Sequence, residues 1–203
     1  PAWFPVGWDA ATDTFRFAAL DAARVGDAAF LDKRLGIDVD ARKVGKDISE
    51  AIFSAPNNTK VFQQDVQPTG SKVIMGLVSD GVAGHMTTVG EKGFIVSDAP
   101  EATKESIIQA IKDSGAEVLI NFLPVGSQLA TEFYMECALE AGVAVVNCMP
   151  VFIASRPEWE KRFRDANLPI VGDDIKAQVG ATIVHRVLSS LFAARGVTVE
   201  RTY

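Results

Sequence analysis

The side chains with the clearest chemical potential lie between a strand pattern and a helix pattern late in the chain. The apolar segment 168–171 is typical of a strand, and Gly172 follows it directly. Asp173, Asp174 and Lys176 come next, where a long helical pattern opens. Because ligands bind open α/β sheets beyond the carboxyl ends of the strands, two carboxylates and a lysine at this place predict a site. Capping of the helix is the alternative role of the carboxylates.

The helix pattern after these carboxylates has apolar residues at every fourth position. Together the two rows form a broad apolar arc, which predicts a long amphipathic helix. Lys176 projects into this arc at the first turn, either as a snorkelling surface lysine or as a cation aimed into a pocket. The rows are Ile175, Val179, Ile183, Val187 and Leu191, and Val184, Leu188 and Phe192.

The elements that must position these residues alternate between strand and helix patterns. Near-continuous apolar strands separated by helices predict an α/β fold with a doubly wound, mostly parallel sheet and flanking helices, incomplete in this chain. The expected strands are 72–79, 118–122, 143–147 and 168–171, the expected helices are 41–53, 100–113, 127–141 and 157–166, segment 80–92 is a loop or short helix, and 197–203 alternates like a strand.

Composition excludes several classes of protein. The 203 residues are 48% hydrophobic and 23% charged, an ordinary balance for a globular domain with a substantial core. With a net charge of −6 and no basic stripe, nucleic acid is not an expected partner. We expect no membrane segment and a cytoplasmic location, with Cys137 and Cys148 as buried thiols. His85 and His185 share no ligand spacing, so no metal site is expected.

Three other strand ends carry side chains able to bind a ligand. Asp38 follows a nominal strand, where an acidic residue of a dinucleotide-binding fold hydrogen-bonds the adenosine ribose. Either Asp38 or Asp40 can cap the helix expected over 41–53, and we expect Asp40 to do so, because the family resemblance described below implies the ribose contact for Asp38. Ser127 can cap a helix or bind a cofactor, and Asn147 can donate to a nicotinamide carboxamide or a sugar hydroxyl, or close an Asx-turn.

Five segments in this order resemble the myo-inositol-1-phosphate synthase family, in its bacterial and archaeal branch. Each motif is short, and their order and spacing together make the likeness specific. It extends from Ile37 to about Arg201. The matching segments are Ile37–Gly45, Ala51–Phe53 with Asn57–Thr59, Leu123–Ser127, Asn147–Ser155 and Gly172–Arg186.

The resemblance implies a reaction and a cofactor. The family converts D-glucose 6-phosphate to 1D-myo-inositol 3-phosphate with tightly held NAD⁺, by oxidation, enolisation, intramolecular aldol closure and reduction, for inositol and phospholipid biosynthesis. Lys176 matches a family site position, and a cation there suits developing enolate and alkoxide charge, with Asp173 or Asp174 to orient it. A homotetramer is implied for the full-length protein. The implied NAD contacts are Asp38, Pro124, Gly126, Ser127, Asn147, Met149 and Asp173.

The first part of the chain departs from the family pattern. A Rossmann unit opens with an apolar strand and a Gly-x-Gly-x-x-Gly turn, whereas Gly7, Gly26 and Gly36 lack that spacing. We therefore expect 1–36 to be an atypical segment foreign to the family, for example through an altered reading frame. Residues 37–203 are then a partial NAD-binding Rossmann-like domain, and the chain is a fragment that does not turn over substrate alone.

Two other functions compete with this interpretation. One is an NAD(P)-dependent oxidoreductase of homoserine-dehydrogenase-like type, which would accumulate NADH. The other is a non-catalytic nucleotide-binding module, which would bind its ligand without any lysine contributing to an activity.

Overall fold

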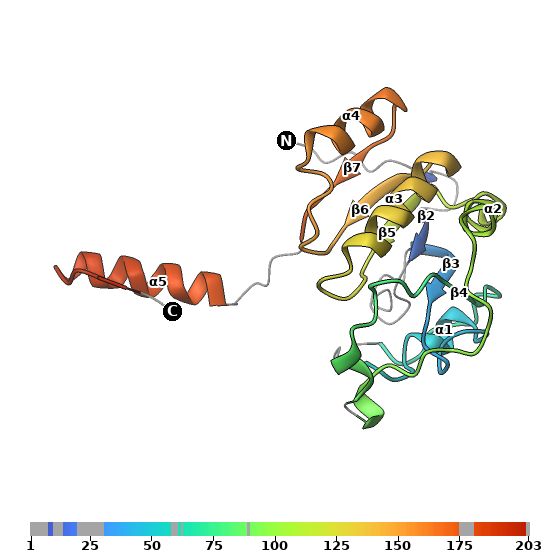
Figure 1. Ribbon diagram of the computed structural model, residues 1–203, viewed down its shortest axis with the longest axis horizontal. Coiled ribbons are helices and arrows are strands. Elements are labelled where there is room, and N and C mark those ends of the chain that lie inside the picture. Colours follow the sequence, from blue (N-terminus) through green and yellow to red (C-terminus); the bar gives the residue numbers. More distant parts are fainter. Residues whose placement is uncertain are drawn as a thin grey trace.

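A mostly parallel sheet organises the molecule (Figure 1). The computed structural model describes residues 8–9, 14–19, 31–57, 61, 63–88, 90–174 and 181–201. Within them the strands form one seven-stranded sheet in the order β4-β3-β2-β5-β6-β7, with β1 paired antiparallel to β2 and every other described pair parallel. The strands are β1 (Trp8–Asp9), β2 (Thr14–Ala19), β3 (Leu31–Asp38), β4 (Val73–Met75), β5 (Val118–Asn121), β6 (Ala144–Asn147) and β7 (Ile170–Val171).

The strand order confirms the doubly wound α/β class. In a dinucleotide-binding sheet the first strand lies in the middle, the next two strands extend to one side and the last three to the other. Here β2 holds that middle place between β3 and β5. The strand order reverses at this point, so the carboxyl ends of these strands border the crevice where such sheets bind ligands. Segment 20–30, where a Gly-rich turn would follow β2, lies outside the described residues.

The helices begin and end at local signals. The Thr103 side chain accepts a hydrogen bond from the Ser106 amide at the start of α2, and Gly115, with φ 64°, ends that helix. Gly142, with φ 78°, ends α3 in the same way. The helices are α1 (Ile48–Ala51), η2 (Gly84–Thr87), η3 (Gly90–Lys92), α2 (Lys104–Ser114), α3 (Gln128–Ala141), α4 (Pro157–Asp165) and α5 (Ala181–Ala194).

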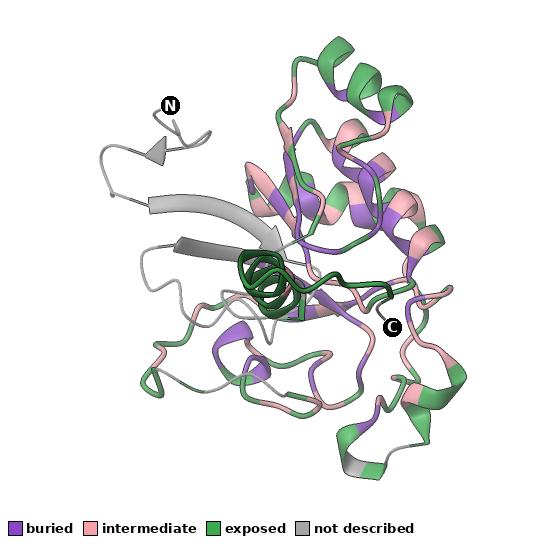
Figure 2. Cartoon of the chain, turned by 90° about the vertical axis from the view of Figure 1, so that its left-hand side faces the viewer, coloured by how far each residue is buried: buried purple, intermediate pink, exposed green. Residues whose placement is uncertain are grey.

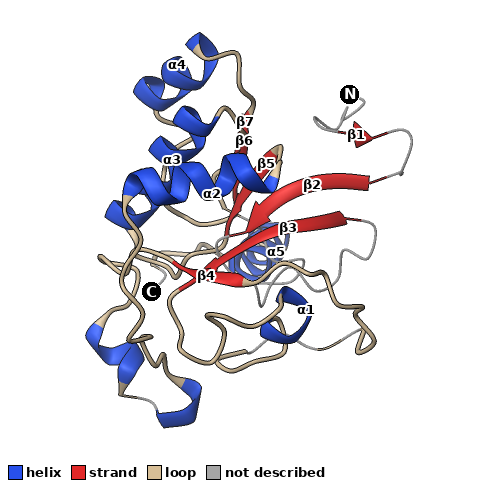
Figure 3. Cartoon of the chain, turned by 90° about the vertical axis from the view of Figure 1, so that its right-hand side faces the viewer, coloured by secondary structure: helices blue, strands red, loops and turns tan. Residues whose placement is uncertain are grey.

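The main core lies between the sheet and α2, α3 and α4 (Figure 3). Strand residues alternate between faces, and Ile37 of β3 and Leu119 of β5 point into this core, where α2 and α3 are buried along their inner sides (Figure 2). A smaller cluster on α1 packs near Gly36, whose added Cβ would lie 3.0 Å from Val73. The sheet is therefore covered on both faces near β3.

The expected helix over 41–53 is wrong, and so is the capping role of Asp40. Residues 41–46 form turns, and α1 begins at Ile48 after Asp47, whose side chain accepts from the Ser49 amide. Asp40 instead accepts hydrogen bonds from the Arg42 amide and guanidinium and, at 3.0 Å, from the Ile95 amide. Asp40 is therefore bonded to its own turn and to a segment 55 residues further along the chain.

The apolar arc of the last helix lies on the surface. The helix α5 spans Ala181–Ala194, and the arc's described residues are 37% to 61% exposed. Figure 1 shows α5 apart from the sheet. Lys176 and the other residues of 175–180 lie outside the described residues. The described part of the expected terminal strand, 197–201, is not a strand.

Among the described residues, no helix has both the length and the apolar character needed to cross a bilayer.

Candidate functional site

A crevice opens at the carboxyl edge of the sheet, between the segments that follow β3, β4 and β5. Tyr134 of α3 lines this crevice, and its hydroxyl oxygen accepts a hydrogen bond from the Leu77 amide at 2.8 Å. This approach requires Gly76, because an added Cβ there would lie 2.3 Å from the Tyr134 oxygen. The crevice is lined by Ile37, Asp38, Val39, Leu77, Val78, Gly81, Phe94, Phe122, Leu123, Pro124 and Tyr134.

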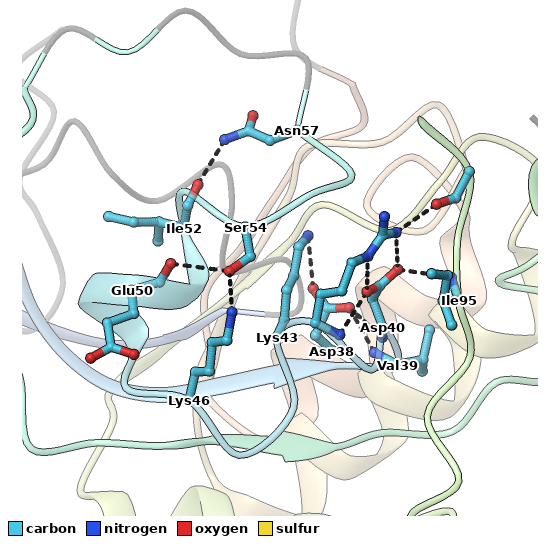
Figure 4. Close-up of polar contacts among 12 residues, drawn as sticks. Asp38, Val39, Asp40, Lys43, Lys46, Glu50, Ile52, Ser54, Asn57 and Ile95 are labelled. Atoms are coloured by element: carbon cyan, nitrogen blue, oxygen red, sulfur yellow. Dashed lines mark hydrogen bonds and ion pairs between the residues drawn. The ribbon is translucent and has the colours of Figure 1, made fainter. Parts of the chain in front are cut away.

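Asp38 provides a carboxylate in the wall of this crevice, and Figure 4 shows the polar contacts of its side chain. One oxygen accepts from the amides of Val39 and Asp40 at 2.7 and 2.9 Å. The other lies 3.1 Å from the ammonium of Lys43, and both side chains are almost fully buried. A buried ion pair with these hydrogen bonds holds the carboxylate in one orientation. Lys43 comes from the turn at 41–46 and was not predicted as a site residue.

The loop after β5 takes a tight turn that Gly126 makes possible. Its φ of 98° favours glycine, and a Cβ at this position would meet nothing within 4 Å. The Ser127 hydroxyl donates to the carbonyl of Pro124 through a short hydrogen bond and does not cap α3. Pro124 lines the crevice, so this loop forms part of its rim.

The first turn of α3 is bound by a carboxylate that sequence reasoning missed. The two oxygens of Asp80 accept from the amides of Leu129 and Ala130, each at 2.8 Å. A negative charge is favourable at a helix N-terminus. The only signal in the sequence was an acidic residue in the Gly-rich segment after β4, which does not reveal its distant partner.

A second polar cluster joins the carboxyl ends of β5, β6 and β7. Asn147 is buried, and its amide nitrogen donates to the Val151 carbonyl at 2.7 Å and to Asp173 at 2.8 Å. Its amide oxygen accepts from Asn121 at 2.9 Å and from the Met149 amide at 3.3 Å. Asn121 was not predicted either.

Asp173 is held by hydrogen bonds from the loop between β6 and α4. It accepts from the amides of Ile153 and Ala154, from Asn147, and from both the amide and the hydroxyl of Ser155. Burial alone would raise the pKa of Asp173, but these hydrogen bonds outweigh it and hold the pKa below its usual range. Asp174 beside it is exposed, with φ 78°.

The predicted site residues therefore fall into two groups along one edge of the sheet. Asp38 and Pro124 line the crevice, and the loop with Gly126 and Ser127 lies at its rim. The other group, around Asn147, contains Met149 and Asp173. The two groups are connected, because Asn121 accepts from the amide of Leu123, a residue of the crevice wall.

Several known proteins are similar to this chain. It is 52% identical over 166 residues to an inositol-3-phosphate synthase of Mycolicibacterium smegmatis. This alignment covers 82% of this chain and 44% of that protein. It is 47% identical over 194 residues to an inositol-3-phosphate synthase of Mycobacterium tuberculosis. That alignment covers 95% of this chain and 51% of the relative. No family model matches the chain. The chain thus spans about half the length of the curated relatives it matches.

One solved structure supports the fold. The crystal structure of Ari2 superimposes with a TM-score of 0.73 at 25% sequence identity, over 91% of this chain and 61% of that one.

Proposed function

Because this chain belongs to the inositol-3-phosphate synthase family, we propose that it forms the NAD-binding part of an enzyme that converts D-glucose 6-phosphate to 1D-myo-inositol 3-phosphate. The observation that carries this proposal is the crevice at the reversal point of the sheet, with Asp38 fixed in its wall. The parent enzyme is then a cytoplasmic homotetramer that provides inositol for phospholipids. The family relation supports these further features.

The residues present fit the adenosine half of NAD. A carboxylate at the end of the second parallel strand is the usual acceptor for the ribose hydroxyls. Asp38 holds that place, and the partly exposed apolar side chains of Val39 and Val78 offer walls for a flat base. When bound, NAD⁺ would accept a hydride from the sugar and return it later. Pro124 and Gly126 would border the cofactor where the loop approaches it.

The catalytic group we propose is Lys176, which follows the two carboxylates in the sequence. An ammonium close to the reacting carbons stabilises negative charge that develops on oxygen. Exposed Asp174 is suited to hold a sugar hydroxyl or to orient this lysine. Because Lys176 lies outside the described residues, its role rests on its position in the sequence and on the family relation.

Calorimetric titration of the chain with NAD⁺ tests the cofactor assignment. We expect Asp38→Ala to raise the Kd by roughly tenfold or more, because the ribose loses a charged acceptor worth about 1.5–3 kcal/mol. Asp98→Ala is the matched control, since Asp98 is exposed and does not line the crevice. Equal Kd values for the chain and for Asp38→Ala would contradict the assignment.

Product analysis of the full-length enzyme tests the reaction. We expect inositol phosphate to form from glucose 6-phosphate with no net change in NADH, and Lys176→Met to abolish this while NAD⁺ remains bound. Accumulating NADH would instead indicate an ordinary dehydrogenase. The 203-residue chain alone is expected to form no product.

A further inference from the structure

The amide of Asn147 has no hydrogen-bonding group left for a ligand. An asparagine side chain offers two N–H donors and one oxygen with two lone pairs. Both donors are used, by the Val151 carbonyl and by Asp173, and the oxygen accepts from Asn121 and from the Met149 amide. A direct hydrogen bond from Asn147 to a cofactor would therefore break one that already exists.

Both carboxylate oxygens of Asp173 also accept hydrogen bonds inside the protein, and most of these come from the loop between β6 and α4. Oδ1 accepts from Asn147 and from the Ala154 amide, at 2.8 and 2.9 Å. Oδ2 accepts from the amide of Ile153 at 3.0 Å and from the amide and hydroxyl of Ser155 at 3.2 and 2.7 Å. Three consecutive amides converge on this carboxylate, which fixes the segment 148–155 against the end of β7.

The same hydrogen bonds lead back to the crevice. From Asp173 they pass to Asn147, then to Asn121 at 2.9 Å, and from Asn121 to the amide of Leu123 at 3.0 Å. Leu123 lines the crevice. Gly172 allows the close approach at the other end, because an added Cβ would lie 2.8 Å from the Asn147 carbonyl oxygen.

We propose that Asp173 is a positioning residue of the cofactor site, which acts through Asn147 and Asn121 on the crevice wall and does not itself touch the cofactor or the sugar. The two adjacent carboxylates then have separate tasks. Asp173 holds the loop and the ends of β5, β6 and β7 in register, and Asp174 faces the solvent side, where a substrate can reach it. This inference rests on the proposed NAD-binding function.

Asp173→Asn is a sharp perturbation because it keeps the shape of the side chain. In either orientation its NH₂ group replaces an oxygen that accepts at least two hydrogen bonds, and an NH₂ group accepts none. Ser155→Ala is the graded variant, since it removes one donor and leaves the amides in place. Asp98→Asn is the matched control, because Asp98 is an exposed carboxylate that does not line the crevice.

Two measurements on the 203-residue chain decide the matter. Hydrogen exchange followed by mass spectrometry reports on the amides of 153–155, and calorimetry gives the Kd for NAD⁺. For Asp173→Asn we expect exchange in 148–155 to accelerate roughly tenfold or more while α2 stays protected, and the Kd to rise roughly tenfold. Ser155→Ala should show both effects more weakly, and Asp98→Asn neither.

Each other outcome overturns the inference in a recognisable way. Unchanged exchange in Asp173→Asn would mean that the carboxylate does not hold the loop. Faster exchange with an unchanged Kd, in Asp173→Asn or in Ser155→Ala, would mean that the loop does not act on the cofactor site, while the proposed function would stand. If the unsubstituted chain did not bind NAD⁺, the proposed function of this chain would fall together with the inference.

Discussion

The close approach of Tyr134 to Gly76 predicts that two substitutions will be strongly coupled. Gly76→Ala places a Cβ 2.3 Å from the Tyr134 hydroxyl oxygen and 2.9 Å from Ile37 Cγ2. The φ of Gly76 is not in the left-handed region, so the cost comes from overpacking, about 2 kcal/mol of unfolding free energy. Tyr134→Phe leaves the Leu77 amide without its acceptor, which costs about 1–2 kcal/mol.

The double variant should be more stable than the sum of these costs predicts. Without the hydroxyl, the nearest ring atom of residue 134 lies 3.6 Å from the new Cβ, which is ordinary contact. We therefore expect a coupling free energy of about 1–2 kcal/mol. Urea unfolding followed by fluorescence of buried Trp159 measures all four proteins of the cycle. Additive costs within about 0.5 kcal/mol would refute the predicted contact.

Three further predictions concern polar side chains that are partly or fully buried. Asp47→Ala should lower the free energy of unfolding in urea by about 2 kcal/mol, since Asp47 caps α1 and accepts from Thr69 and Gly70; a loss below about 0.5 kcal/mol would contradict this. Hydrogen bonds outweigh desolvation and hold the pKa of Asp47 below its ordinary value, as they do for Asp173. The free energy of unfolding, measured by circular dichroism, should therefore be retained above about pH 4 and fall as the pH drops through the pKa values of the two carboxyls in the folded chain. A free energy of unfolding that does not change with pH would argue against these lowered pKa values. Burial raises the pKa of Cys137 to about 12, so iodoacetamide at pH 8 should modify it in urea and leave it intact in the folded chain.

Regular elements with a local stop signal were predictable from the sequence. The ends expected for the helices 100–113 and 127–141 match those of α2 and α3, where Gly115 and Gly142 adopt the left-handed conformation without a Cβ penalty. The strands β5 and β6 match their apolar runs, because a parallel strand buried on both faces needs such residues. The helix expected at 41–53 failed because its periodicity carries no trace of the distant bond from the Ile95 amide to Asp40.

The positions of the candidate site residues were more predictable from the sequence than their hydrogen-bonding partners. The rule that ligands bind beyond strand ends selected Asp38, Asn147 and Asp173, and the structure places all three along one edge of the sheet. Residue type alone did not reveal that every hydrogen-bonding group of Asn147 is used inside the protein. That depends on the course of the loop after β6, which is set by contacts between segments far apart in the chain.

The central place of β2 has a consequence for the order in which the chain can fold. Its neighbour β5 pairs Val118 with Phe17, so the partners are separated by roughly 100 residues of chain. Closing a loop of that length costs about 4 kcal/mol of chain entropy, which the contacts between β2 and β5 must offset. At about 5–20 residues per second of synthesis, β2 waits on the order of 5–20 s for this neighbour to exist. Until then the edge that pairs with β5, at 17–19, is open, so this part of the strand is where a nascent chain would recruit a chaperone or pair with the wrong partner.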